Sequence, residues 1–231
     1  MDILNIKDYI RNLDTVVGCT VGCNYCFARI NNKRFPVTED FAVPELVEKR
    51  LKRISTKTPN TYLMTSSSDF SDWKEEWRSR VFHCMEQNPQ HNYLFLTKRP
   101  ERVRFSTTMD NVWIGVTVTT EKDKERIAWL KKNIGALHYF ITFEPLHRDV
   151  SKMDLEGVGW IVIGTETGSR KGKVTTRAEW IENIVIQASA LDIPVFMKAT
   201  LADIVGPGHM LQNFPSDFLK LDKTKGENRN G

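Results

Sequence analysis

Seven short apolar runs, most of them separated by stretches with helical periodicity, constrain the fold of this chain more than any other feature. Runs of this kind, without polar alternation, are typical of parallel strands that are buried on both faces. The runs lie at residues 15–18, 61–65, 92–97, 112–118, 138–143, 160–163 and 194–198. Helices are predicted at residues 44–54, 72–87, 122–132 and 176–191,. The pattern predicts an α/β fold, as a partial or near-complete parallel (β/α) barrel.

The length and charge of the chain bound its organisation. The 231 residues suffice for one large domain, and the net charge of +4 permits a nucleic-acid partner without requiring one,. We expect a single barrel domain at residues 1–212 and a polar, lysine-rich tail at residues 213–231,. No apolar run approaches the roughly 20 residues that span a bilayer, and no signal-peptide pattern begins the chain. We therefore expect a cytoplasmic protein without membrane contact.

Three of the four cysteines lie within eight residues, with the spacing C-x3-C-x2-C at Cys19, Cys23 and Cys26. Thiolates this close together on a glycine-containing loop can converge on one metal centre. Three thiolates leave one iron of a [4Fe–4S] cluster without a protein ligand. A disulfide is disfavoured by the odd count and the absence of a secretion signal. A zinc site would need a histidine, and the first in the chain is His83,.

Polar residues stand at the carboxyl ends of the predicted strands, where barrels of this class place their active sites. Because burying many charges without partners is costly, we expect these residues to face one another or a ligand. Apart from the cysteine loop they are Ser66, Ser67, Ser68, Asp69, Lys98, Arg99, Thr117, Thr119, Glu144, Thr165, Glu166 and Lys198. Structural alternatives remain open: residues 66–69 also fit a turn that caps a helix, and Glu144 fits a salt bridge to Lys98 or Lys198.

Three further features carry weaker signals. The loop at residues 164–173 holds three glycines and three cations, which suits a phosphate or carboxylate, although it does not match a P-loop,. His147 fits either an ordinary loop histidine or a proton carrier. Cys84, in a predicted helix, fits either a small core residue or a hydrogen-atom donor. Thr176 and Glu179 have the spacing of a capping box at the last predicted helix,.

The cysteine spacing, with Tyr25 directly before the last cysteine, resembles the signature of the radical S-adenosylmethionine superfamily. The resemblance implies an enzyme with a barrel of the radical S-adenosylmethionine type, in which Cys19, Cys23 and Cys26 hold a [4Fe–4S] cluster and the open iron binds S-adenosylmethionine. It implies reductive cleavage of that cofactor to a 5′-deoxyadenosyl radical, which abstracts hydrogen from a substrate. An electron donor of the flavodoxin or ferredoxin type is then a required partner.

The resemblance also implies roles for the polar strand ends. Tyr25 is expected beside the adenine, and Lys98, Glu144 and Lys198 are expected to order the ligand or substrate as the catalytic set. The expected contacts to S-adenosylmethionine are Ser66, Asp69, Thr117, Gly164 and Glu166. The family commonly places a Gly-Gly-Glu-like motif after the second strand, where it meets the methionyl amine. This chain has serines and Asp69 there instead.

Several other stretches are similar to one phage- and mobile-element-associated branch of radical S-adenosylmethionine-like proteins. They are residues 17–19, 23–28, 65–69, 96–102, 111–118, 143–146, 163–168 and 195–198, in the expected order. The chain departs from the branch at residues 164–166, where Gly-Gly-Glu is more usual, and at residues 199–200, where an aromatic residue is frequent. The branch implies no particular reaction. Its mobile-element association and the mild basicity of the chain favour a nucleic acid or a protein as substrate.

A second hypothesis is a non-catalytic nucleic-acid-binding module with a structural zinc or iron–sulfur site. Its affinity would fall steeply as the salt concentration rises. The phosphate contacts would come from Arg99, Arg102, Arg104, Arg170, Lys171 and Lys173.

Overall fold

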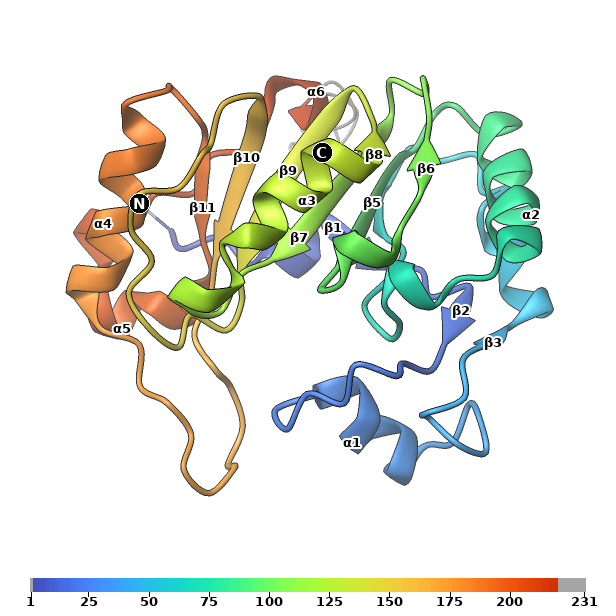
Figure 1. Cartoon of the computed structure of the whole chain (residues 1–231), viewed down its shortest axis with the longest axis horizontal. Helices are drawn as coiled ribbons and strands as arrows, with labels where there is room; N and C mark the ends of the chain where they lie inside the picture. The colour runs from blue at the N-terminus through green and yellow to red at the C-terminus, as the bar shows by residue number, and fades with distance from the viewer. Residues whose placement is uncertain (1, 220–231) are drawn as a thin grey trace, which may run out of the picture. The chain divides into compact units, whose positions relative to one another are not determined.

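The computed structural model describes residues 2–219, which form a mixed α/β fold (Figure 1). Its main sheet contains strands β1 (Ile10–Asn12), β4 (Thr61–Leu63), β5 (Asn92–Thr97), β7 (Val112–Thr117), β9 (His138–Phe143), β10 (Val158–Ile163) and β11 (Val195–Met197). Two small sheets pair β2 (Val16–Val17) with β3 (Glu45–Leu46) and β6 (Phe105–Ser106) with β8 (Ile134–Gly135).

The α-helices are α1 (Phe27–Arg34), α2 (Glu75–Glu86), α3 (Glu125–Asn133), α4 (Ala178–Ser189), α5 (Ala202–Val205) and α6 (Ser216–Leu219). Short 3-10 helices are η1 (Ile6–Asp8), η2 (Glu48–Arg53), η3 (Phe70–Asp72), η4 (Pro100–Arg102), η5 (Glu121–Asp123), η6 (Ala199–Leu201) and η7 (Pro207–His209). In the part of the chain that the structure describes, no helix has both the length and the apolar character needed to cross a bilayer.

The chain divides into two compact units. The first, which we call the cysteine unit, contains residues 10–116 and 129–137; the second, the C-terminal unit, contains residues up to 9, 117–128 and those from 138 onward. The cysteine unit has the strand order β1-β4-β5-β7 and the C-terminal unit the order β9-β10-β11. Every pairing within each of these two runs is parallel. The predicted α/β fold with a parallel sheet is therefore confirmed.

The parallel register of the cysteine unit determines which loops meet. Ile10 lies opposite Thr61, and Thr61 lies opposite Asn92. The carboxyl ends of β1, β4 and β5 consequently share one edge of the sheet, because parallel strands run in the same direction. The segments that leave these ends are the chain leading to the cysteines, residues 64–69 and residues 98–99. They can therefore contact one another although they are far apart in sequence.

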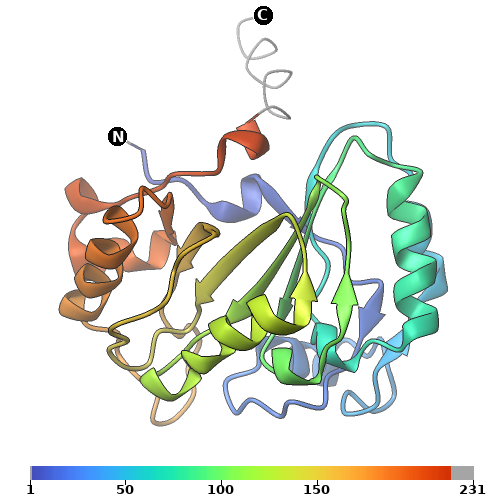
Figure 2. The ribbon, with the colours of Figure 1, turned by 45° about the horizontal axis from the view of Figure 1, so that its top comes forward.

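Aromatic side chains form the core of the cysteine unit. Phe82 of α2 stacks on Phe95 of β5 with ring centroids 5.2 Å apart, and Phe70 lies 5.1 Å from Phe95. Helix α2 belongs to the same unit as these strands and is the green helix at the right of Figure 2. Trp73 and Met85 are also buried. Such contacts are stabilising both by burial of large apolar area and by the geometry of the rings.

The C-terminal unit has a core that reaches beyond the predicted domain end. Trp160 Nε1 donates a hydrogen bond to the carbonyl of Asn213 at 3.0 Å, and the ring of Phe214 lies 4.7 Å from that of Phe196. Phe218 is buried as well. Residues 213–218, which we expected in a polar tail, thus contact the sheet because their aromatic rings outweigh the neighbouring charges. Residues 220–231 of the predicted tail lie outside the described residues.

Two expectations near the amino terminus are wrong. The run at residues 15–18 does not belong to the main sheet, because β2 pairs antiparallel with β3. The first main strand is β1, which lies outside every run predicted as a strand. Residues 44–54 were expected to form an α-helix but form β3 and η2. Pairing with β2, together with a hydrogen bond from Val47 N–H to the Thr15 carbonyl (2.7 Å), overrides their helical propensity,.

The predicted capping box is also absent. Helix α4 begins at Ala178, and its N-cap residue, Arg177, makes no side-chain capping bond. The hydroxyl of Thr176 instead donates to the Leu146 carbonyl at 2.8 Å, and its oxygen lies 2.9 Å from Thr165 Oγ1. Thr176 therefore bonds to the Leu146 carbonyl of a neighbouring loop and does not cap the first turn of α4.

A buried histidine joins two loops of the cysteine unit. His91 Nδ1 accepts a hydrogen bond from Asn60 N–H at 3.1 Å, so its Nε2 carries the proton and faces the Ile54 carbonyl at 3.0 Å. The ring is fully buried. Burial lowers the pKa of His91 below its ordinary value, although the bond to the Ile54 carbonyl acts in the opposite direction,.

We expect His91 to make the folded protein sensitive to acid. Since its pKa is lower in the folded than in the unfolded state, the unfolded state binds more protons as the pH falls below about 6.5. Between pH 6.5 and 5.5 the wild type should lose up to about 1 kcal/mol of unfolding free energy more than a His91→Gln variant, measured by urea unfolding. A variant of the exposed His83, His83→Gln, is the control. Equal pH slopes for the wild type and His91→Gln would contradict this assignment.

Candidate functional site

The cysteine loop runs from β2 to α1 and has a defined backbone. Gly18 has φ 107° and Gly22 has φ 76°. A Cβ atom on Gly18 would lie 2.8 Å from the Pro44 Cα, so only glycine allows the chain to pass this point,. At the other end Cys26 is the N-cap residue of α1, and its N–H donates to the Cys23 carbonyl at 3.2 Å. The loop is therefore fixed at both ends.

Two of the three sulfur atoms receive backbone hydrogen bonds. Val21 N–H donates to Cys19 Sγ at 3.5 Å, and Arg29 N–H donates to Cys26 Sγ at 3.4 Å. Hydrogen bonds of this kind tune the cysteine ligands of iron–sulfur clusters. Burial, reinforced by the charges of Asp69 and Asp72, raises the pKa of the Cys19 thiol to about 12. Without a metal this thiol is protonated at neutral pH, and binding a metal would release its proton.

The three thiols fit a metal centre by their chemistry but are not assembled around one point. Within residues 2–219, no group of three or more histidine, cysteine, aspartate or glutamate side chains is gathered closely enough to hold a metal ion. The donor set of three cysteines, two with N–H bonds to sulfur, suits an iron–sulfur cluster better than zinc, because no histidine precedes His83,.

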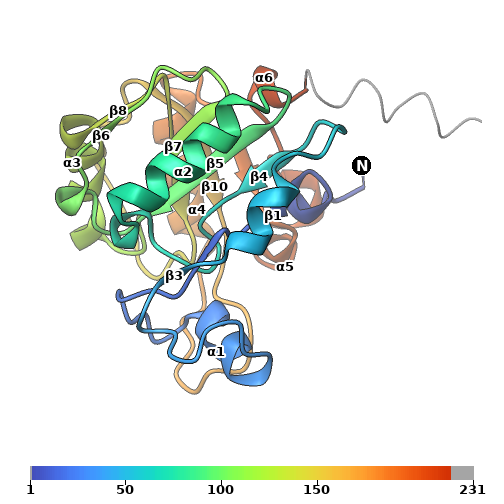
Figure 3. The same cartoon turned by 90° about the vertical axis from the view of Figure 1, so that its right-hand side faces the viewer.

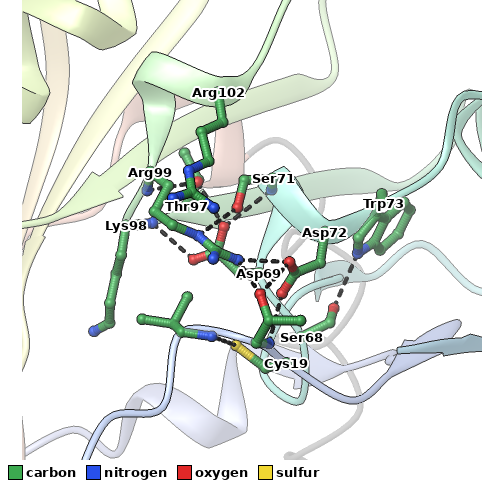
Figure 4. Close-up of polar contacts among 12 residues, drawn as sticks. Cys19, Ser68, Asp69, Ser71, Asp72, Trp73, Thr97, Lys98, Arg99 and Arg102 are labelled. Carbon is green, nitrogen blue, oxygen red and sulfur yellow. Dashed lines mark hydrogen bonds and ion pairs between the residues drawn. The ribbon is translucent and has the colours of Figure 1, made fainter. Parts of the chain in front are cut away.

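A network of buried charges fastens the loop beside Cys19 (Figure 4). Asp72 Oδ2 accepts from Thr20 N–H at 2.9 Å, and its Oδ1 accepts from the Thr20 hydroxyl at 2.7 Å. Arg99 Nη2 lies 2.5 Å from the same Oδ1 and 2.7 Å from Thr20 Oγ1. The Asp72 and Arg99 side chains are only 9% and 16% exposed. We call these three residues the Asp72 clamp; it joins the loops after β4 and β5 to the cysteine loop.

A second carboxylate holds the segment that leads into the loop. Asp14 is buried and accepts from the Ser66 hydroxyl (2.7 Å), Ser67 N–H (2.8 Å) and the Ser67 hydroxyl (2.9 Å). Gly18 N–H donates to the Ser67 carbonyl at 3.0 Å. Burial raises the pKa of Asp14, while the serine hydrogen bonds lower it. Sequence reasoning missed Asp14; the available signal was an acidic residue next to the apolar Leu13, which requires partners if buried.

Ser66 and Asp69, two of the expected contacts to S-adenosylmethionine, bond to the protein itself. The Ser66 hydroxyl donates to Asp14, as described above. Asp69 accepts from Ser71 N–H at 2.9 Å, the Thr97 hydroxyl at 2.6 Å and Lys98 N–H at 2.8 Å. Asp69 is also the N-cap residue of η3, which matches the capping alternative for this segment. Their contact with a cofactor stays a prediction.

Two other predicted residues meet directly. Lys98, which follows β5, extends to the cysteine loop, where its Nζ lies 3.1 Å from Tyr25 Oη. Figure 4 shows the Lys98 side chain pointing away from Asp69 and Arg99. No carboxylate among residues 2–219 forms an ion pair with this half-buried lysine. The ammonium group therefore places an uncompensated positive charge beside Tyr25.

In the C-terminal unit, three predicted residues gather at the carboxyl ends of β9, β10 and β11. Lys198 forms an ion pair with Glu144, the salt bridge that the sequence analysis left open. Gly164 lies against this pair, because a Cβ atom there would be 3.1 Å from Lys198 Cδ and 3.3 Å from Glu144 Cγ. Lys198 N–H donates to the Ile163 carbonyl at 2.9 Å. The parallel register thus brings Glu144, Gly164 and Lys198 together.

The remaining two predicted residues of this unit are buried and hydrogen-bonded. Glu166 accepts from Arg170 Nε at 2.6 Å and Nη2 at 2.9 Å, and His147 Nε2 lies 3.0 Å away. Hydrogen bonding by Arg170 is the main cause that lowers the pKa of Glu166 to about 2, so this carboxylate is ionised at neutral pH. Thr117 Oγ1 accepts from the Thr142 hydroxyl at 3.2 Å.

The family described as "Protein of unknown function (DUF5131)" matches residues 6–202. The chain therefore belongs to this family, and the matched region contains the cysteine loop and every predicted site residue. No curated protein and no solved structure matches the chain.

Breaking the Asp72 clamp should destabilise the protein. In an Asp72→Asn variant the mostly buried Arg99 loses its counter-charge, which we expect to cost about 3 kcal/mol of unfolding free energy. The control is Arg80→Gln, because the Arg80–Glu48 pair is exposed and should contribute less than about 1 kcal/mol,. Urea unfolding of both variants at one pH gives the comparison. Equal losses in the two variants would contradict the structural role of the clamp.

The alkylation rate of Cys19 should report its raised pKa. The thiolate is the reactive form, so in the metal-free folded protein the rate with iodoacetamide should still rise above pH 10,. Peptide mass spectrometry of timed samples measures this rate for Cys19 alone. In urea the alkylation rate of Cys19 should stop rising once the pH passes the ordinary cysteine pKa of about 8.5. A plateau at that pH in the folded protein would show that burial does not protonate this thiol.

Proposed function

We propose that this member of the family is a radical S-adenosylmethionine enzyme whose [4Fe–4S] cluster is held by Cys19, Cys23 and Cys26. The observation that carries the proposal is a three-thiol loop that Asp14 and the Asp72 clamp fasten to the carboxyl ends of parallel strands. When bound, the cluster supplies one electron that cleaves S-adenosylmethionine to methionine and a 5′-deoxyadenosyl radical, which can abstract hydrogen from a substrate.

The polypeptide would bind and orient the reactants. The Lys98 ammonium, which has no carboxylate partner among the described residues, suits the carboxylate of the methionyl group,. Its contact with Tyr25 Oη would hold both side chains against the cysteine loop, where Tyr25 would lie beside the adenine. Ser66 and Asp69 would contribute chiefly by fixing the loops around this ligand, since their side-chain oxygens bond to protein groups.

For the C-terminal unit, considered by itself, we propose ligand-ordering roles for the predicted residues. Glu144 and Lys198 would order the substrate through their ion pair. Gly164, which has no side chain, leaves room for this ion pair. The ionised Glu166 would accept hydrogen bonds from ligand hydroxyl groups, and Thr117 would contact the ligand by its hydroxyl. The seven strands of the main sheet support the finer proposal of a partial barrel of the radical S-adenosylmethionine type. We propose a nucleic acid or a protein as the substrate.

The rival function, a nucleic-acid-binding module without catalysis, has less support from the side chains. Three of its six expected phosphate contacts form ion pairs: Arg99 with Asp72, Arg102 with Glu101 and Arg170 with Glu166. A guanidinium held by a carboxylate in this way has fewer donors left for phosphate.

Cleavage of S-adenosylmethionine should depend on the cysteine loop. The protein is reconstituted without oxygen with iron and sulfide, reduced with dithionite and mixed with S-adenosylmethionine, and 5′-deoxyadenosine is measured by chromatography. We expect product from the wild type and from Cys84→Ser, whose cysteine lies in α2. Cys23→Ser should give only the background level, because the cluster loses a ligand. Bound zinc without any 5′-deoxyadenosine from the wild type would overturn the proposed function.

A further inference from the structure

Half of the exposed large apolar side chains lie in one short segment. Of ten such residues in the part that the structure describes, five fall within residues 27–43: Phe27, Ile30, Phe35, Val37 and Val43. Phe27 is 68% exposed and Phe35 is 73% exposed. We call these five residues the α1 surface. Concentrated apolar exposure of this kind marks interaction sites on soluble domains.

Hydrogen bonds to a buried side chain, Asn32, hold the segment that carries the α1 surface. The buried Asn32 donates from Nδ2 to the Thr38 carbonyl at 2.9 Å and accepts from Val37 N–H at 2.9 Å. The chain after α1 thus folds back through hydrogen bonds to Asn32. Phe27 and Ile30 are three residues apart and share one face of the helix. Figures 1 and 3 show α1 well apart from α2 of the same unit.

The charges around the α1 surface select a class of partner. Helix α1 contains Arg29, Lys33 and Arg34 and no acidic residue. A second copy of this chain, with a net charge of +4, does not complement these cations. A nucleic acid would leave the three aliphatic side chains unused; Glu39 and Asp40 of the same segment follow α1 in the sequence and do not discriminate between negatively charged partners. An acidic protein surface with an apolar centre complements both the cations and the apolar side chains.

The α1 surface also belongs to the segment that carries the thiols. Helix α1 begins directly after Cys26, whose Sγ accepts the Arg29 N–H. The Arg29 side chain donates from Nη2 to the Cys19 carbonyl at 3.0 Å. A protein bound on α1 would therefore lie next to a centre held by the cysteine loop.

We propose that the α1 surface docks an acidic electron-transfer protein that reduces this centre. The inference rests on the proposed function, because only reductive cleavage requires an outside electron. The reduced donor loses one electron and the cluster gains it; no bond forms or breaks, and no proton moves in that step. A surface of a few apolar residues bordered by cations suits such a partner, since electron-transfer encounters use small interfaces.

Binding of an acidic donor tests the surface without relying on catalysis. Oxidised flavodoxin is titrated into the full-length reconstituted protein in a calorimeter at low salt. We expect Phe27→Ser and Arg34→Glu each to weaken binding about tenfold, and higher salt to weaken wild-type binding. The matched control is Ile186→Ser, which removes another exposed apolar side chain, 60% exposed, from α4. Unchanged flavodoxin affinity in Phe27→Ser and Arg34→Glu, or no wild-type binding, would overturn the proposal.

A second readout separates this proposal from the proposed function. With dithionite as reductant, Phe27→Ser should form 5′-deoxyadenosine at the wild-type rate; with reduced flavodoxin it should be about tenfold slower at subsaturating donor. Equal loss with both reductants would mean that the variant damages the cluster site, and would overturn the docking proposal alone. No product from the wild type with dithionite would overturn the proposed function and the docking with it. A change in self-association or RNA binding, with flavodoxin binding intact, would assign the surface to another occupant and overturn the docking proposal.

Discussion

The ion pair between Asp72 and Arg99 is the interaction on which the cysteine loop depends. Both side chains are mostly buried, so each requires the other to compensate its charge,. Asp72 follows β4 and Arg99 follows β5, and the parallel register brings both segments to the edge from which the chain to the cysteines departs. Thr20, the residue after Cys19, bonds to both of them. These bonds fix the short, glycine-containing loop at the position of its first thiol.

The carboxylates near the loop have several protein partners, whereas one lysine there forms no ion pair with a carboxylate of the described residues. Asp14, Asp69 and Asp72 each accept at least three hydrogen bonds from protein groups. Polar residues at strand ends thus largely face one another, which removes the cost of burying them. Lys98 differs, since its ammonium group contacts the Tyr25 side chain and pairs with no carboxylate in the part of the chain that the structure describes. This difference separates residues that build the site from a residue that is available to an anionic ligand.

Sequence patterns predicted the parts of the fold that rest on local periodicity. The later six apolar runs all correspond to strands, because fully buried parallel strands need continuous apolar residues,. Strand β1 was missed since only Ile10 of its three residues is buried. Residues 44–54 were assigned wrongly because their structure depends on pairing with β2, a distant segment. The three cysteines were visible from spacing alone, but Asp14 was not, since its serine partners lie 52 and 53 residues away.

Helix α1 begins directly after Cys26 and carries part of the α1 surface. The chemical identity of the centre that the cysteines bind therefore decides which function is assigned to the whole segment. The most direct measurement is ⁵⁷Fe Mössbauer spectroscopy of the anaerobically reconstituted protein, with and without S-adenosylmethionine. A cluster held by three cysteines predicts about four iron atoms per chain, one of which changes its signal when S-adenosylmethionine binds. Iron signals that do not respond to S-adenosylmethionine, or a site filled by zinc, would contradict the account.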